Sequence, residues 1–281
     1  MLAVALAIVS AVLFGAMTVA VRAGLRADAD VAALATVVPA LAIALAAVGV
    51  EAAVTGDADV SEAWPFALAG LLAPGGSQLL FTLAIRDAGP SRTSIAVGTA
   101  PLVSVVIALI ALDEPVRAPL LAGAALVVVG GIALVSEPVR PDHVRSAGLV
   151  FAGGATLLFA TRDNVIRWLS RGDAPRPTTA AAATLLVGTL VALAYARRRP
   201  SRGELRAFVP AGVAFGLSYV CLFEAYYRGR VTVVSPLVAT ESLFGVAFSA
   251  ALYRAREAIG LRLALGAALI VAGGALIGIF R

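Results

Sequence analysis

Ten apolar segments, each about twenty residues long, divide the sequence and are separated by short polar connections. A helix needs roughly 20 mostly apolar residues to cross the hydrocarbon core of a bilayer. Hydrophobic residues make up 60% of the chain and charged residues only 14%, so the chain is far more apolar than a soluble domain. The segments are too long and too rich in alanine to alternate as the strands of a barrel. We therefore predict an all-α integral membrane protein with ten transmembrane helices, at residues 2–22, 31–53, 64–86, 91–112, 116–136, 147–169, 177–196, 206–227, 231–253 and 259–280.

The sequence also contains an internal repeat. The four residues Gly123–Leu126 return unchanged as Gly266–Leu269, and in both places a pair of glycines follows. At a slightly different offset, Ser77 corresponds to Ser218. Five segments precede the connection near residue 141 and five follow it; because five is odd, the second half must enter the membrane from the opposite side. We predict two inverted five-helix repeats, at residues 1–140 and 141–281.

The charges of this chain are those of a membrane protein. All 22 basic residues are arginine, and without lysine a P-loop that binds nucleotide phosphates is not expected. The net charge of +5 would suggest nucleic acid as a partner of a soluble protein, but these arginines lie at the ends of apolar segments, where they anchor helices at the interface. No nucleic-acid partner is therefore predicted.

Fourteen arginines lie around connections that follow odd-numbered segments, and seven around the other connections and the C-terminus. The positive-inside rule then predicts a protein of the inner (cytoplasmic) membrane with both termini outside.

The stretch from Ser77 to Leu134 resembles the second part of the EamA unit of the drug/metabolite transporter superfamily. A characteristic helix end, Ala84–Arg86, is followed by a segment with a central proline, Pro101. Glu114 comes just after that segment, and the next segment has the spaced glycines Gly123 and Gly130. The second half repeats this order, and its Glu241-Ser242 stands where many members carry Glu-Pro. The resemblance implies a ten-helix exporter or exchanger of small metabolites with a central cavity between the halves. Two features depart from the family pattern: the connection after the second segment is acidic, and the predicted outside location of the termini opposes the usual cytoplasmic one.

Charged residues inside the apolar segments are the strongest candidates for a site. Each costs roughly 2.5–3.5 kcal/mol at the centre of a membrane helix, so such residues require a reason. Glu241 lies near the middle of the ninth segment and corresponds to Ala100 in the first half. We interpret Glu241 as a residue that takes up a coupling proton or binds a cationic group, and Arg162 as one that binds an anionic group. The alternative is a structural cluster in which Arg162, Asp163 and Glu241 neutralise one another.

Prolines and hydrogen-bonding side chains suggest where a cavity lies. The prolines inside the segments either shape a central cavity or merely bend their helices; they are Pro39, Pro74, Pro101 and Pro236. The polar side chains near them either line that cavity or join helices. The predicted cavity residues are Ser77, Gln78, Pro101, Arg162, Ser218, Tyr219 and Glu241. Tyr226 and Tyr227 are assigned to an interfacial aromatic belt. The glycines of the fifth and tenth segments are predicted to pack helices closely, inside the bundle or at a homodimer contact.

Catalysis has little support in the sequence. The only histidine, His143, lies in a connection, and no group of histidines and cysteines has the spacing of metal ligands. We predict no enzyme activity, no metal and no cofactor.

The sequence instead favours a secondary active transporter that exports a small polar metabolite, such as an amino acid, by alternating access. A lipid-carrier flippase, or another membrane protein without metabolite transport, is the alternative.

Overall fold

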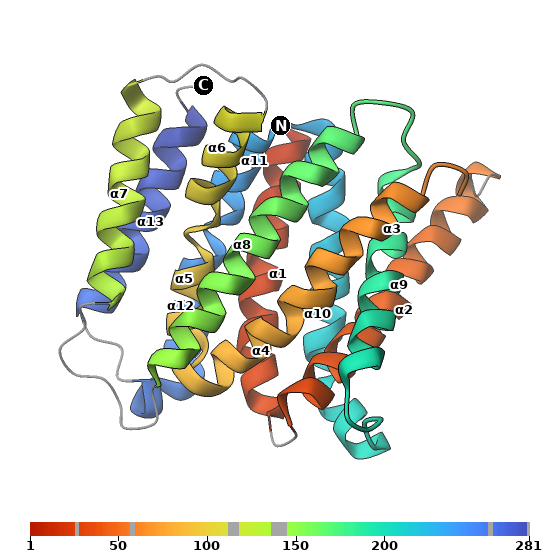
Figure 1. Cartoon of the computed structure of the whole chain (residues 1–281), viewed down its shortest axis with the longest axis horizontal. Helices are drawn as coiled ribbons and strands as arrows, with labels where there is room; N and C mark the ends of the chain where they lie inside the picture. Colours follow the sequence, from red (N-terminus) through yellow and green to blue (C-terminus); the bar gives the residue numbers. More distant parts are fainter. Residues whose placement is uncertain (26–27, 57–59, 112–117, 136–144, 258–260, 280–281) are drawn as a thin grey trace.

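A computed structural model of the chain describes every residue except 26–27, 57–59, 112–117, 136–144, 258–260 and 280–281. Within the described residues all regular elements are helices (Figure 1). Six segments are each long and apolar enough to cross a membrane: α1 (Leu2–Gly24), α2 (Ala29–Thr55), the segment Trp64–Ala88, α8 (Ser146–Leu169), α9 (Pro177–Tyr195) and α10 (Arg202–Arg228). The remaining segments comprise α7 (Ala118–Val135), α13 (Leu261–Ile279) and two interrupted helices. The protein is an all-α, multi-pass membrane protein, as the sequence predicts.

Three of the segments that the sequence predicts as continuous helices are interrupted. The third consists of α3 (Trp64–Gly70), a π-helical stretch η1 (Leu71–Gly76) and α4 (Ser77–Ala88). Its interruption has a local cause, since Pro74 has no backbone N–H to donate and Ala73 has the non-helical angles φ −144° and ψ 122°. The fourth segment consists of α5 (Pro90–Val97) and α6 (Ala100–Ala111), and the ninth of α11 (Val231–Val238) and α12 (Glu241–Glu257).

The breaks change the expected role of two prolines. The sequence places Pro101 inside a continuous helix, but it is the second residue of α6, where a helix needs no N–H donor from it. Its side chain lies outside the described residues. Pro236 lies in the last turn of α11, just before the second break. These prolines therefore mark the ends of half-helices instead of kinks within long ones.

The two repeats are inverted and pack in a symmetric way. In Figure 1, α1 starts at the upper edge, near both termini, whereas α8 starts at the lower edge. Helix α1 packs along α10, and the corresponding helices α8 and α4 pack along each other. Helix α2 packs on its counterpart α9, and α7 on its counterpart α13. The predicted boundary between the repeats, at residues 140 and 141, lies outside the described residues.

Glycines set the closest helix crossings. A Cβ added to Gly212 or Gly216 of α10 would lie 2.6 Å from the carbonyl oxygen of Thr36 or Ala40 on α2. Small residues four apart let membrane helices approach in this way. A Cβ on Gly130 of α7 would lie 2.7 Å from the carbonyl oxygen of its neighbour on α13, Gly266. The glycine of α7 therefore serves packing inside the chain, one of the two possibilities that the sequence leaves open.

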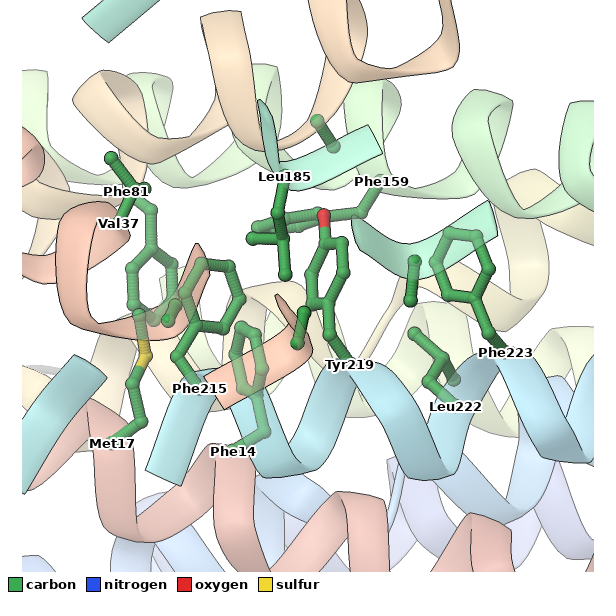
Figure 2. Close-up of a cluster of buried hydrophobic side chains, with 14 of the residues drawn as sticks. Phe14, Met17, Val37, Phe81, Phe159, Leu185, Phe215, Tyr219, Leu222 and Phe223 are labelled. Carbon is green, nitrogen blue, oxygen red and sulfur yellow. The ribbon is translucent and has the colours of Figure 1, made fainter. Parts of the chain in front are cut away.

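An aromatic cluster occupies the centre, where the repeats meet (Figure 2). The Phe14 ring makes edge-to-face contacts with Phe81, Phe159 and Phe215, with centroid distances of 5.3 to 6.1 Å. Phe159 follows Phe14 by 145 residues and stands in the same local pattern, since Val12-Leu13-Phe14 corresponds to Leu157-Leu158-Phe159. Two equivalent side chains of the two repeats thus touch each other, which places the symmetry axis at this cluster.

Candidate functional site

A small polar cavity lies beside the aromatic cluster, between the two repeats. Its polar lining comes from α1, α8, α10 and the start of α12: Ser10, Arg162, Asp163, Ser218, Tyr219 and Glu241. Its volume is about 30 Å³. A single water needs about 10–15 Å³ measured in this way, so the cavity accommodates one or two waters and no metabolite. In this structure the cavity is therefore too small for a substrate.

Two of the three interrupted segments, the fourth and the ninth, break at this cavity. Val97 and Ala100 line it from the first break, and Val238 and Glu241 line it from the second. Backbone hydrogen bonds continue through each break, for example from the Thr99 N–H to the Ala96 carbonyl and from the Thr240 N–H to the Leu237 carbonyl, both at 3.1 Å. The two ends of each broken helix nevertheless meet at the cavity. In transporters with inverted repeats, substrate sites are commonly built in this manner.

Each break contains a threonine at the equivalent position of its repeat. The Thr99 hydroxyl donates a hydrogen bond to the Ala96 carbonyl at 2.6 Å, and the Thr240 hydroxyl donates to the Leu237 carbonyl at 2.6 Å. Both threonines lie three residues after the carbonyl that they bond, and they correspond to each other at an offset of 141 residues. Each carbonyl also accepts the backbone N–H of the same threonine at 3.1 Å, so the hydroxyl and the backbone close the turn together. This repeated threonine is the signal in the sequence that could have revealed both breaks.

Arg162 and Asp163 form a buried ion pair on α8. Nε of Arg162 lies 2.8 Å from Oδ1 of Asp163, and both side chains are almost completely buried. The contact lacks the alignment of a hydrogen bond, so Nε and Nη1 of Arg162 have no hydrogen-bond partner in the described part of the chain. The guanidinium carbon lies 4.8 Å from the centre of the Tyr219 ring, a distance typical of a cation–π contact.

Tyr226 holds the second oxygen of Asp163. Its hydroxyl donates a hydrogen bond of 2.7 Å to Oδ2, and its ring is fully buried. The assignment of Tyr226 to an interfacial aromatic belt is therefore wrong. The sequence contained no signal for this contact because Tyr226 and Asp163 are 63 residues apart and lie on different helices.

Glu241 lies in the same cavity as the ion pair. It is the first residue of α12, is 5% exposed and lines the cavity. Among the described residues it has no hydrogen-bond or ion-pair partner, and Arg162 pairs with Asp163 instead. Arg162, Asp163 and Glu241 thus line one cavity, in which the first two form the ion pair. The amino end of a helix favours a nearby negative charge, but Glu241 has no basic partner of its own.

The predicted cavity residues fall into two groups. Arg162, Ser218, Tyr219 and Glu241 line the cavity together. Ser218 also joins helices, because its hydroxyl and that of Ser10 each donate to the carbonyl of the other residue at 3.0 Å. Ser77 and Gln78 lie fully buried on α4 and do not line the cavity in this conformation.

The inverted repeats, the broken helices and the polar cavity between them define an integral membrane protein built in the manner of secondary transporters. The model of the EamA-like transporter family matches residues 1–136 and 146–279, and the chain belongs to this family of transporters, within the drug/metabolite type. A solved structure titled "Crystal structure of protein" is 20% identical to the chain and superposes with a TM-score of 0.71. The match covers 98% of this chain and 95% of that one and supports the fold alone. No curated protein matches the chain.

Proposed function

We propose that the protein is a secondary active exporter of a small metabolite that carries an amino group, such as an amino acid. The observation that carries this proposal is the charge balance of the cavity. Arg162 is positive, whereas Asp163 and Glu241 are both acidic, so full ionisation leaves one uncompensated negative charge in a buried site. An isolated buried carboxylate is costly unless a proton or a cation neutralises it. A substrate ammonium group and a proton are therefore alternative partners of Glu241.

The remaining groups suit the carboxylate of an amino acid. Nη1 of Arg162 has no hydrogen-bond partner in the described part of the chain, and guanidinium N–H groups bind carboxylates through charge-assisted hydrogen bonds. The Tyr219 hydroxyl also has no partner there. In this arrangement Glu241 binds the ammonium group and Arg162 the carboxylate, at opposite sides of one cavity. The cavity must enlarge first, and the two helix breaks are the natural hinges.

Competition at Glu241 provides a coupling mechanism. A carboxyl that binds either a proton or an ammonium group exchanges one for the other across the membrane. Alternating access then lets an inward proton gradient drive an amine out of the cell. Coupling requires only that both ligands cannot be bound at once, and a single buried carboxyl satisfies that condition.

Transport assays in proteoliposomes test the proposal with radiolabelled amino acids and an imposed pH gradient. Glu241→Gln removes the exchangeable proton, and we expect it to abolish transport driven by the pH gradient. Glu62→Gln makes the same chemical change in an exposed polar connection and is the matched control, expected to leave transport unchanged. Transport that stays gradient-dependent in Glu241→Gln would exclude proton coupling through this residue.

A lipid-carrier flippase is the second candidate, because of an apolar pocket between α1 and α12. It has a volume of about 260 Å³ and is lined by alanines of α1 together with Phe248, Leu252 and Tyr253. Among the side chains that the structure describes, its lining includes no charged one, and it shares no residue with the polar cavity. The described lining thus offers a lipid phosphate no counter-charge, whereas the polar cavity offers charged groups to a soluble metabolite, and this favours the metabolite as the substrate. Export of labelled lipid carrier without amino acid transport would reverse the preference.

A further inference from the structure

Ser77 and Gln78 begin α4 and are both fully buried. Their three polar side-chain atoms have no hydrogen-bond partner in the part of the chain that the structure describes. A buried polar group without a partner costs stability that alanine or leucine at the same position would not. Adjacent residues that both carry this cost need an explanation, and a ligand bound in another conformation provides one.

The repeat relates these two residues to the polar cavity. At an offset of 141 residues, Ser77 corresponds to Ser218 and Gln78 to Tyr219, and both counterparts line the cavity. The Ser218 hydroxyl is satisfied by Ser10, but the position equivalent to Ser10 in the second repeat is Ala155, 145 residues later. The hydroxyl of Ser77 therefore has no serine at the equivalent place. Ser77 and Gln78 thus occupy the positions of the first repeat that are equivalent to the cavity-lining residues Ser218 and Tyr219 of the second.

The charged residues of the cavity have no charged counterparts. Arg162, Asp163 and Glu241 correspond to the uncharged Met17, Thr18 and Ala100. The region around Gln78 can thus form hydrogen bonds with a ligand. It has no ion pair, because Met17, Thr18 and Ala100 stand where the other repeat has charged residues. Such a region binds the same ligand more weakly than the charged cavity does, because hydrogen bonds to charged groups are the stronger ones.

We propose that Gln78 and Ser77 form a second, low-affinity subsite for the substrate carboxylate, occupied when the transporter opens to the other side of the membrane. During alternating access the repeats rock around the central site, and the inverted repeats exchange their conformations. The wall of the first repeat, closed in this structure, can therefore open toward the site in the other state. The Gln78 amide and the Ser77 hydroxyl then donate hydrogen bonds to the carboxylate that Arg162 binds in the first state. This proposal rests on the proposed function and adds a release site to it. Weak binding at that site favours substrate release.

Cysteine labelling tests the subsite without knowledge of the substrate. In a Cys221→Ala background, Ser77→Cys and Ser218→Cys are each treated with a membrane-impermeant charged methanethiosulfonate in right-side-out and inside-out vesicles. We expect Ser218→Cys, in the central cavity, to react from both sides of the membrane and Ser77→Cys to react from one side only. Reaction of Ser77→Cys from both sides, or from neither side, would overturn the proposal.

Transport and stability measurements separate a binding role from a structural one. With a mixture of radiolabelled amino acids, Gln78→Leu should lower exchange about tenfold, the order expected for a lost hydrogen bond to a charged group. Thr82→Val is the control, because its hydroxyl bonds only its own helix, at the Gln78 carbonyl. If Gln78→Leu raises the unfolding temperature and leaves exchange unchanged, the polar atoms have no ligand and the inference is wrong. If the unsubstituted protein moves none of these amino acids, the proposed function fails and the labelling result alone decides the subsite.

Discussion

Tyr226 and Tyr227 are neighbours on α10 with opposite surroundings. The Tyr226 hydroxyl bonds Asp163, whereas the Tyr227 hydroxyl has no hydrogen-bond partner in the described part of the chain. Removing the first leaves a buried carboxylate oxygen unsatisfied, which typically costs about 1–3 kcal/mol. We therefore expect Tyr226→Phe to lower the unfolding temperature of the purified protein clearly. Tyr227→Phe removes a hydroxyl without a partner, and we expect it to be neutral or slightly stabilising.

The comparison of these two variants also tests the buried pair at the cavity. Both changes delete one oxygen from adjacent residues of the same helix, so effects of detergent or expression cancel. Equal shifts of the unfolding temperature would mean that the bond from Tyr226 to Asp163 contributes nothing to stability. A larger loss in Tyr226→Phe would show that Asp163 needs both of its partners.

At the level of helices, the crossing of α2 and α10 makes a sharp prediction about glycine. A Cβ on Gly216 meets the Ala40 carbonyl oxygen at 2.6 Å, and backbone cannot move aside as a flexible side chain does. Overpacking of this kind typically costs about 1–3 kcal/mol, so Gly216→Ala should lower the unfolding temperature. Gly153 on α8 has nothing within 4 Å of its Cβ position. Gly153→Ala should raise stability slightly, because alanine is the better helix former. A loss of stability in both variants would contradict this packing account.

Much of this helical architecture follows from the sequence, and the breaks do not. Length and apolarity define the ten segments, and Gly123 with Gly266 reveals the duplication. The breaks escape such reasoning because each segment still has the length of one membrane-spanning helix, and the residues at the breaks, Thr99 with Pro101 and Pro236 with Thr240, also occur in continuous helices. For the candidate site, the rarity of membrane charges points to Arg162 and Glu241. The pairing of Arg162 with its own neighbour and the separation of Gln78 from the cavity depend on helix packing, which no local pattern encodes.

At the scale of the whole molecule, the two repeats share a backbone plan but not a charge distribution. The axis between them passes through the contact of Phe14 with Phe159, two equivalent residues. On one side of that axis the equivalent positions hold Arg162, Asp163 and Glu241, and on the other they hold uncharged residues. The duplication thus provides the two related conformations that alternating access needs. In the proposed mechanism, the difference in charge would make the two conformations bind substrate unequally, while the ion gradient sets the direction of transport.

The orientation of the whole molecule can be tested directly. Both termini lie at the same edge of the bundle, and the connection between α9 and α10 lies at the opposite edge (Figure 1). That connection carries Arg197, Arg198 and Arg199, all exposed, and arginine-rich connections remain in the cytoplasm. We therefore expect an alkaline phosphatase fused after residue 281 to be active on the non-cytoplasmic side of the membrane and a green fluorescent protein at the same place to be dark. Fusions after Arg199 should give the reverse pattern and serve as the control. A fluorescent C-terminal fusion would place the termini in the cytoplasm, and the excess of arginine at the opposite edge would then have to serve a purpose other than topology.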